Sequence, residues 1–351
     1  MASAFNPNAA SSADSGIFGL PYSHAESALV YLPVPWEATT SYGGGTAEGP
    51  AAILAASRQV DLFDADVLRP YESGLYLLPE SREVRRRARA ARKLAAPIIA
   101  RGGDLGRNFA LRRNLAAVNA ASEWLNAIVE TETEKQLAAG KIVGLLGGDH
   151  STPFGAIRAA AQRHPGLGVL QIDAHADFRR AFEGFTYSHA SIMFNVLDKI
   201  PEVARLVQVG IRDFCEEEFA FARSQGRRAK IYWDADLQTR RHAGTPWKKT
   251  VAEIVASLPK EIWISFDIDG LDPRYCPHTG TPVPGGLDFA EANALFAAVA
   301  RSGRKIVGFD LNEVSPDPTG RSEWDANVGA RMLYKLTAWT LVSQGLCRIR
   351  K

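Results

Sequence analysis

Short apolar runs alternate along the chain with longer segments in which apolar residues recur every three or four positions. The apolar runs of strand length are Ala28–Leu32, Ile142–Leu146, Gly168–Ile172, Leu206–Gly210, Lys230–Trp233, Ile262–Phe266 and Ile306–Phe309. Runs of this length, rich in aliphatic and β-branched residues, predict buried β-strands. Helical periodicity occupies most of the intervals between them, at Leu115–Ala138, Phe154–Arg163, Glu216–Ser224, Thr250–Ser257 and Phe289–Ser302, and then Glu323–Val342.

This order of strands and helices predicts an α/β fold. A strand that is followed by a helix and then by another strand normally belongs to a parallel sheet, with helices covering both faces. We therefore expect a three-layer α/β/α architecture with a mostly parallel central sheet. No linker-like stretch divides the chain after residue 27, so residues 27–351 should form a single domain, preceded by a flexible extension over residues 1–26.

Charge and composition give no reason to expect nucleic acid or a membrane as a partner. The formal net charge is only +2. One basic run, Arg82–Lys93, is interpreted as the solvated face of a helix, because no aromatic residues interleave with its charges. No stretch approaches the length of apolar sequence that a membrane-spanning helix needs.

Cysteine usage and the N-terminus indicate a cytoplasmic protein. The three cysteines, Cys215, Cys276 and Cys347, form neither a CxxC pair nor an even framework, so we interpret them as reduced thiols. The N-terminal segment has no basic region followed by an apolar core, as a secretory signal would have.

Polar clusters follow three of the predicted strands, as LLGGDHS, QIDAHAD and SFDIDGLDP. In the second cluster Asp173, His175 and Asp177 alternate, so in a strand-like backbone their side chains point to one side. Buried carboxylate and imidazole groups placed together are costly unless something binds them. In α/β sheets, ligands bind beyond the carboxyl ends of the strands, where all three clusters lie.

The residue types in these clusters favour a metal centre. The candidate ligands are His150, Asp173, His175, Asp177, Asp267 and Asp269. Like charges at one edge of a sheet oppose ionisation, and divalent cations remove that cost. Six ligands with bridging carboxylates suit two metal ions. Oxygen-rich ligands with some nitrogen and no sulfur favour Mn²⁺, with Ni²⁺, Co²⁺ or Zn²⁺ as competitors.

The same motifs resemble the signatures of the ureohydrolase superfamily, which contains arginase and agmatinase. The resemblance extends over roughly residues 27–345 and includes Ser41–Ile53, Thr279–Leu287 and Gly308–Pro316. It implies an arginase-like fold, two divalent metal ions, Mn²⁺ or Ni²⁺, and hydrolysis of a guanidino compound to urea and an amine or ammonia. It also implies a homo-oligomer, a trimer or hexamer, or a mixed oligomer with a related subunit.

Carried over residue by residue, the resemblance implies a role for each group. One metal would be held by His150, Asp173, Asp177 and Asp267, and the other by His175, Asp173, Asp267 and Asp269. Asp177 would also orient the attacking hydroxide, and Glu313 would pair with the planar guanidinium. His189 would carry a proton to the leaving amine, a role that suits an imidazole pKa near 6.5.

The segment between Asp177 and His189 departs from the arginase pattern and bears on the substrate. It carries the bulky residues Phe182, Phe185 and Tyr187 where arginase-like relatives place small polar ones. We predict that these aromatic side chains line a small pocket that favours free guanidine or a short alkylguanidine over arginine, as in guanidine hydrolases, which use nickel. The alternative is that they are ordinary packing residues.

Other activities stay open from the sequence. Agmatinase, guanidinobutyrase and metformin-hydrolase-type activities share the expected metal set. A second alternative is hydrolysis of a related C–N bond, as in formiminoglutamate or an acetylated polyamine. A non-catalytic subunit of a mixed oligomer is disfavoured, because such a subunit would be expected to have lost ligands.

Overall fold

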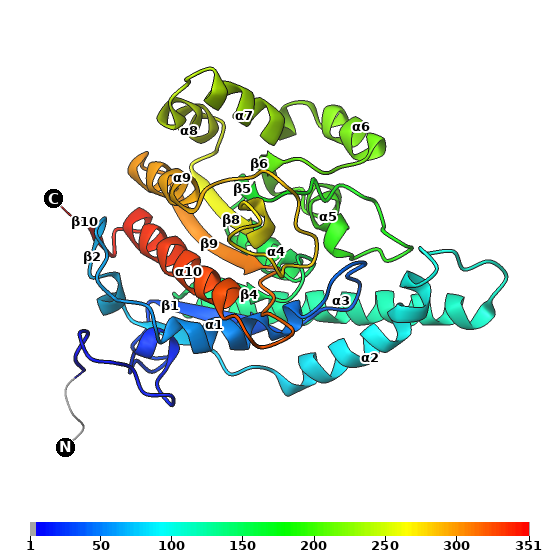
Figure 1. The fold of residues 1–351 in the computed structure, drawn as a ribbon, viewed down its shortest axis with the longest axis horizontal. Helices are drawn as coiled ribbons and strands as arrows, with labels where there is room; N and C mark the ends of the chain where they lie inside the picture. The colour runs from blue at the N-terminus through cyan, green and yellow to red at the C-terminus, as the bar shows by residue number, and fades with distance from the viewer. Residues whose placement is uncertain (1–4, 351) are drawn as a thin grey trace.

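The central feature of the computed structural model, which describes residues 5–350, is a sheet of eight strands in the order β3-β1-β4-β9-β8-β5-β6-β7 (Figure 1). Every pairing within it is parallel, which confirms the predicted sheet. The strands are β1 Leu29–Val34, β3 Leu75–Leu77, β4 Ile142–Gly147, β5 Leu167–Ile172, β6 Val203–Ile211, β7 Ala229–Trp233, β8 Glu261–Asp267 and β9 Lys305–Asn312. A small antiparallel pair, β2 (Val67–Leu68) and β10 (Arg348–Ile349), lies apart from this sheet.

Helices cover both faces of the sheet, as the three-layer prediction requires (Figure 1). They are α1 Gly49–Ser57, α2 Arg82–Ile99, α3 Phe109–Ala138, α4 Phe154–Arg163, α5 Ile192–Lys199, α6 Glu216–Ser224, α7 Asp234–His242, α8 Trp247–Ala256, α9 Phe289–Arg301 and α10 Trp324–Ser343. Short 3₁₀ turns lie at Ile17–Gly19, Thr46–Glu48, Pro70–Ser73, His189–Ser191, Gly226–Arg228 and Ile268–Gly270. The predicted bounds of α4 and α6 match the structure. Strand β3 was not predicted, because so short a strand shows no periodic pattern of apolar residues.

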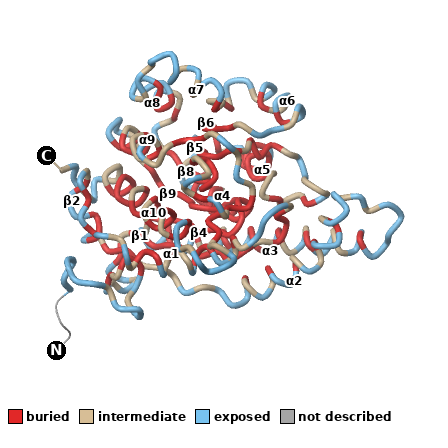
Figure 2. Tube along the Cα trace, viewed as in Figure 1, coloured by how far each residue is buried: buried red, intermediate tan, exposed pale blue. Residues whose placement is uncertain are grey.

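Two apolar clusters form the core, one on each face of the sheet. Residues of α1, α8, α9 and α10 pack on one face, and residues of α2 to α6 pack on the other. Alternation within β5 illustrates the geometry, since Leu170 and Ile172 belong to the first cluster and Leu167 and Val169 to the second. Figure 2 shows the strands buried and the outer faces of the helices exposed.

Two surface expectations have different outcomes. The basic run lies in α2, where Arg86 and Arg87 pair with Glu83 on an exposed face, as expected of a solvated helix. Part of the expected flexible extension is instead packed on the core, because Ile17 and Phe18 are almost completely buried. Within residues 5–350, no helix has the length and apolar character needed to cross a membrane.

Candidate active site

Four adjacent strands deliver the candidate residues to one edge of the sheet. β4, β9, β8 and β5 are neighbours in that order, and in a parallel sheet their carboxyl ends coincide. His150 follows β4, Glu313 follows β9, and the DAHAD segment follows β5. Asp267 is the last residue of β8, and Asp269 lies in the turn behind it. Sequence positions far apart therefore converge because of strand order alone.

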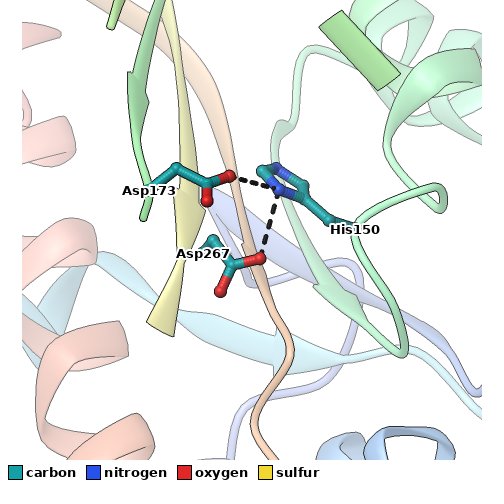
Figure 3. A group of neighbouring side chains, drawn as sticks. All are labelled: His150, Asp173 and Asp267. Carbon is teal, nitrogen blue, oxygen red and sulfur yellow. Dashed lines mark ion pairs between the residues drawn. The ribbon is translucent and has the colours of Figure 1, made fainter. Parts of the chain in front are cut away.

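The first group of side chains centres on His150 (Figure 3). Its Nδ1 atom lies 2.8 Å from Asp173 Oδ2, 3.2 Å from Asp267 Oδ2 and 3.3 Å from Asp177 Oδ2. The opposite ring nitrogen, Nε2, is 2.9 Å from the hydroxyl oxygen of Ser265. With Nε2 engaged, Nδ1 is the nitrogen that is free to face a ligand among the carboxylates.

The second group centres on His175 and shares Asp173 with the first. His175 Nδ1 lies 3.0 Å from Asp269 Oδ2 and 3.6 Å from Asp173 Oδ1. Donor atoms within each of the two groups, His150–Asp173–Asp267 and Asp173–His175–Asp269, lie within 4.8 Å of one another. The structure thus brings all six predicted ligand residues together, with Asp173 between the two groups.

The electrostatics of these groups indicate the kind of ligand that the site would hold. Burial, followed by the nearby charges of Asp269 and Asp173, raises the pKa of Asp267 well above its ordinary value. Burial and then Asp173 raise the pKa of Asp177 to about 7. Carboxyls that resist ionisation in this way need positive charge beside them. Nδ1 of His150 is buried and makes no regular hydrogen bond. The residues present therefore fit divalent cations.

A layer of buried polar side chains beneath the carboxylates was missed by the sequence analysis. Ser265 connects His150 to Asp310, because its hydroxyl donates to Asp310 Oδ1 at 2.8 Å. Gln171 donates to Asp173 Oδ2 at 2.7 Å and accepts from Gln208. The available signal was a polar residue inside an otherwise apolar buried strand, which is costly unless it is hydrogen-bonded.

Asp177 and Glu313 adopt the left-handed backbone region, with φ values of 53° and 61°. Non-glycine residues rarely occupy this region, and such residues cluster at functional sites. The side chain of Glu313 is buried, and its Oε1 accepts the backbone N–H of His150 at 2.9 Å. Its carbonyl oxygen accepts the hydroxyl of Thr279 at 2.8 Å. These contacts hold the carboxylate next to the two histidine-centred groups.

His189 lies beside Glu313, with 3.8 Å between Nδ1 and Glu313 Oε1. Its Nε2 is buried and has no hydrogen-bond partner within the described chain. Burial, and then the charges of His175 and His150, lower the pKa of His189 to about 3. The imidazole is therefore neutral near pH 7, and its pKa is lower than the ordinary value near 6.5 that the sequence-based prediction of a proton-carrying role assumed.

A small cavity opens over these residues. It is lined by Ser41, His175, Asp177, Arg179, Phe182, His189, Ala190, Asp213, Phe214, Glu218 and Thr281, and its volume is about 170 Å³. Drug-sized ligands occupy pockets of roughly 300–1,000 Å³, so this cavity suits a smaller molecule. The guanidinium of Arg179 lies 4.7 Å from the ring of Phe182 and 3.6 Å from Glu218, so these three side chains form one side of the cavity.

The aromatic wall that we expected is only partly present, which corrects the prediction for two of its three residues. Phe182 lines the cavity. Phe185 is fully buried and instead packs against Ala95, Ile98 and other residues of α2 and α3. Tyr187 lies against Phe154, and its hydroxyl accepts a hydrogen bond from Lys199 at 2.9 Å. Apolar packing against the helices holds both rings outside the cavity.

Two relatives of similar sequence bear on the family to which the chain belongs. N(1)-aminopropylagmatine ureohydrolase of Thermus thermophilus is 32% identical over 315 residues, which is 90% of each chain. Guanidinobutyrase of Pseudomonas aeruginosa is 31% identical, over 87% of this chain and 84% of the relative.

Solved structures support the same fold. Agmatine ureohydrolase of Thermoplasma volcanium superposes with a TM-score of 0.70 at 23% identity, over 93% of this chain and 94% of that one. Proclavaminate amidino hydrolase of Streptomyces clavuligerus also has a TM-score of 0.70 at 23% identity, over 94% of this chain and 97% of the other. The profile of the Arginase family matches residues 27–338. The chain therefore belongs to the arginase family, whose members are metal-dependent hydrolases of C–N bonds in guanidino compounds.

Proposed function

We propose that the protein hydrolyses a small guanidino compound, with free guanidine or a short alkylguanidine as the best substrate. The observation that carries this proposal is the small cavity, in which Phe182 and Phe214 face the carboxylate-rich edge of the sheet. A cavity of this volume has room for a guanidino group with a short substituent, but little room for the α-amino and α-carboxylate groups of an amino acid such as arginine. A small guanidine fits such a cavity, because its only charged group is the one that reacts.

We assign the six carboxylate and imidazole residues as ligands of two divalent cations, Mn²⁺ or Ni²⁺. His150, Asp173, Asp177 and Asp267 would hold one ion, and His175, Asp173, Asp267 and Asp269 the other. The sharing of Asp173 between the two groups supports this assignment. Two such cations, when bound, lower the pKa of water and supply a nucleophile at neutral pH.

The remaining residues would bind the substrate and orient the attacking oxygen. Glu313 would accept hydrogen bonds from the planar guanidinium, for which a carboxylate is a matched bidentate partner. Burial, and then Asp267 and Asp149, raise its pKa well above the ordinary value, so a cation beside it stabilises the ionised form. Asp177 lies 3.3 Å from His150 and would orient the attacking oxygen.

His189 would manage the proton of the leaving amine. Its imidazole, 3.8 Å from Glu313, would accept a proton in the cavity and pass it to the leaving amine. Phe182 lies 6.4 Å from the ring of His189 and helps to exclude water there.

A second candidate is a guanidino compound with a distant cationic group, such as agmatine or aminopropylagmatine. The carboxylate of Asp213, which lines the cavity and is 68% exposed, supports it, because that group is available to pair with an ammonium. Formiminoglutamate-type substrates lack support of this kind. Homo-oligomeric assembly and a cytoplasmic location stay predictions.

The decisive experiment is a urea-release assay over guanidine, methylguanidine, agmatine, aminopropylagmatine, 4-guanidinobutyrate and arginine. The enzyme is loaded separately with Mn²⁺ and with Ni²⁺. The proposal predicts the highest kcat/KM for guanidine or methylguanidine. The highest value for agmatine or aminopropylagmatine would support the second candidate, and the highest value for arginine would contradict both.

A further inference from the structure

A histidine–carboxylate pair lies outside the six proposed ligands and outside the residues that line the cavity. His278 precedes Thr279, Gly280 and Thr281, and these four residues are called the 278–281 loop here. The Nδ1 atom of His278 lies 2.8 Å from Asp325 Oδ2, and its backbone N–H donates to Asp325 Oδ1 at 2.9 Å. Asp325 is almost completely buried in the first turn of α10, where the helix dipole stabilises a carboxylate.

A second acid faces the other side of the same imidazole. His278 Nε2 lies 3.7 Å from Asp317 Oδ1. The Asp317 carboxylate closes a tight turn by accepting the backbone N–H groups of Thr319 at 2.8 Å and Ser322 at 3.0 Å. His278 therefore links three segments, namely the 278–281 loop, the turn after β9 and the start of α10. Asp325 and Asp317 are the charged groups that raise its pKa.

The 278–281 loop reaches directly into the candidate active site. Thr279 donates to the carbonyl oxygen of Glu313 at 2.8 Å, and Thr281 donates to Asp269 Oδ2 at 3.4 Å. A methyl group added at Gly280 would lie 3.6 Å from Glu313 Oε2. Gly43 packs so closely on the other side that a methyl group there would lie 2.7 Å from Gly280 Cα. The loop is thus confined between Glu313 and the segment around Gly43.

Glu313 needs such support more than an ordinary residue does. Its φ of 61° is a conformation that a non-glycine residue adopts only when its surroundings enforce it. The contacts that enforce it include its backbone N–H to Gly148 O at 2.9 Å and the Thr279 hydroxyl on its carbonyl oxygen. Of these two, the Thr279 contact depends on where the 278–281 loop lies.

We propose that the His278–Asp325 pair is a positioning device that holds the 278–281 loop, and through Thr279 holds Glu313, in the geometry that binds the substrate guanidinium. The proposal rests on the guanidinium-binding role assigned above to Glu313. His278 is not among the residues that line the cavity, and its described polar partners are Asp325 and Asp317, so it acts through other residues. Small displacements of a positioned group can reduce rates by about 100-fold.

The test is a double-mutant cycle on the metal-loaded enzyme. His278→Ala should lower kcat/KM by about 10- to 100-fold, mainly through KM, with metal content unchanged. In the Glu313→Gln background the same substitution should lower kcat/KM less than about twofold, because residues that act as one unit are non-additive. If turnover of the double variant is below detection, calorimetric binding of guanidinium chloride replaces it as the readout.

Matched variants separate positioning from general stability. Thr279→Val removes only the hydroxyl that contacts Glu313 and should reproduce the KM effect even if His278→Ala folds poorly. His278→Asn keeps a short side-chain donor and should recover part of the loss. His164→Ala removes another histidine–carboxylate pair, at 3.1 Å from Glu261, and should leave KM unchanged.

Three results would overturn the proposal. Equal losses from His278→Ala in both backgrounds would indicate a general structural effect. Loss of metal in His278→Ala would place its influence on the ligands and not on Glu313. An unchanged KM in both His278→Ala and Thr279→Val would remove the linkage itself. If Glu313→Gln alone left kcat/KM unchanged, the proposed role of Glu313 would fail first, and this outcome is distinct from the other three.

Discussion

Two parts of the candidate active site are built on different principles. The first part is the group of carboxylates and imidazoles at the strand ends, where the register of the sheet fixes the positions of the side chains. β5 pairs with β8 so that Ile172 lies opposite Phe266, which places the next residues, Asp173 and Asp267, beside each other. The other part comes from the loop between Asp177 and His189, which lies outside the eight-stranded sheet.

The loop contains a tight reversal, and its aromatic residues lie in different surroundings. Phe182 and Phe185 exchange backbone hydrogen bonds of 2.8 Å and 3.1 Å across Glu183 and Gly184, which both have positive φ values. The two rings nevertheless lie in different surroundings. Phe182 enters the cavity and Phe185 enters the core between α2 and α3. Strand ends therefore specify chemistry reliably, whereas loop composition specifies a wall only when the turn geometry is known.

Among substitutions at the strand ends, we expect the largest loss of activity from Asp267→Asn. We expect loss of at least one metal ion per subunit and no detectable urea release, because the variant loses a charged oxygen beside both His150 and Asp269. Elemental analysis of the purified protein measures the metal. Asp236→Asn, at an exposed position on α7, is the matched control and should keep both ions. Full metal occupancy in Asp267→Asn would contradict the ligand assignment.

Glu313→Gln tests the proposed binding of the substrate guanidinium at the strand ends. The variant should retain both metal ions, because Glu313 is not among the proposed ligands. Removing one partner of a desolvated charged pair costs about 2–5 kcal/mol. That corresponds to a loss of roughly thirtyfold to several thousandfold in kcat/KM. Steady-state kinetics and elemental analysis on one preparation test both statements, and an unchanged kcat/KM would show that Glu313 does not hold the guanidinium.

Alanine substitutions in the loop should separate its two aromatic residues. Phe185→Ala leaves a cavity in the core and should lower the free energy of unfolding by about 3–5 kcal/mol without changing the order of substrate preference. Phe182→Ala should change stability much less and shift preference toward longer guanidines. Denaturant unfolding and the substrate panel measure the two effects. The reverse pattern would mean that Phe185, not Phe182, contacts substrate.

Ser265→Ala addresses the polar layer beneath the carboxylates. The hydroxyl orients His150 and contacts Asp310. Removing a partner of this kind typically weakens metal affinity by about 10- to 100-fold. Titration of the metal-free protein with Mn²⁺ gives the affinity directly. An affinity equal to that of the unsubstituted protein would mean that the ring of His150 is held by packing alone.

The sequence was sufficient for the parallel sheet and for bringing His150, Asp173 and Asp267 together, because strand order and alternation are local signals with a global consequence. It was insufficient for Phe185 and Tyr187, since their directions depend on a turn and on packing against helices that are distant in sequence. Thr279 lay in a recognised motif and His278 directly precedes it, but their roles depend on contacts with Glu313 and with α10, which no local pattern encodes.

The smallest predicted effect is a pH dependence of stability that involves His278. Its pKa is raised in the folded chain, chiefly by the hydrogen bond to Asp325, so its contribution to stability is fully present below the unfolded value of about 6.5 and is lost as pH rises through the folded value. His278→Asn has no such titration. The difference in unfolding free energy between the unsubstituted protein and this variant should therefore be larger at pH 5.5 than at pH 9. The effect should be small and should decrease with added salt, because the imidazole is partly exposed and solvent screens it.

Denaturant unfolding of both proteins at the two pH values measures this pH dependence. A difference that grows with increasing pH would show that the histidine is destabilised as a cation, and that Asp325 is not its dominant partner.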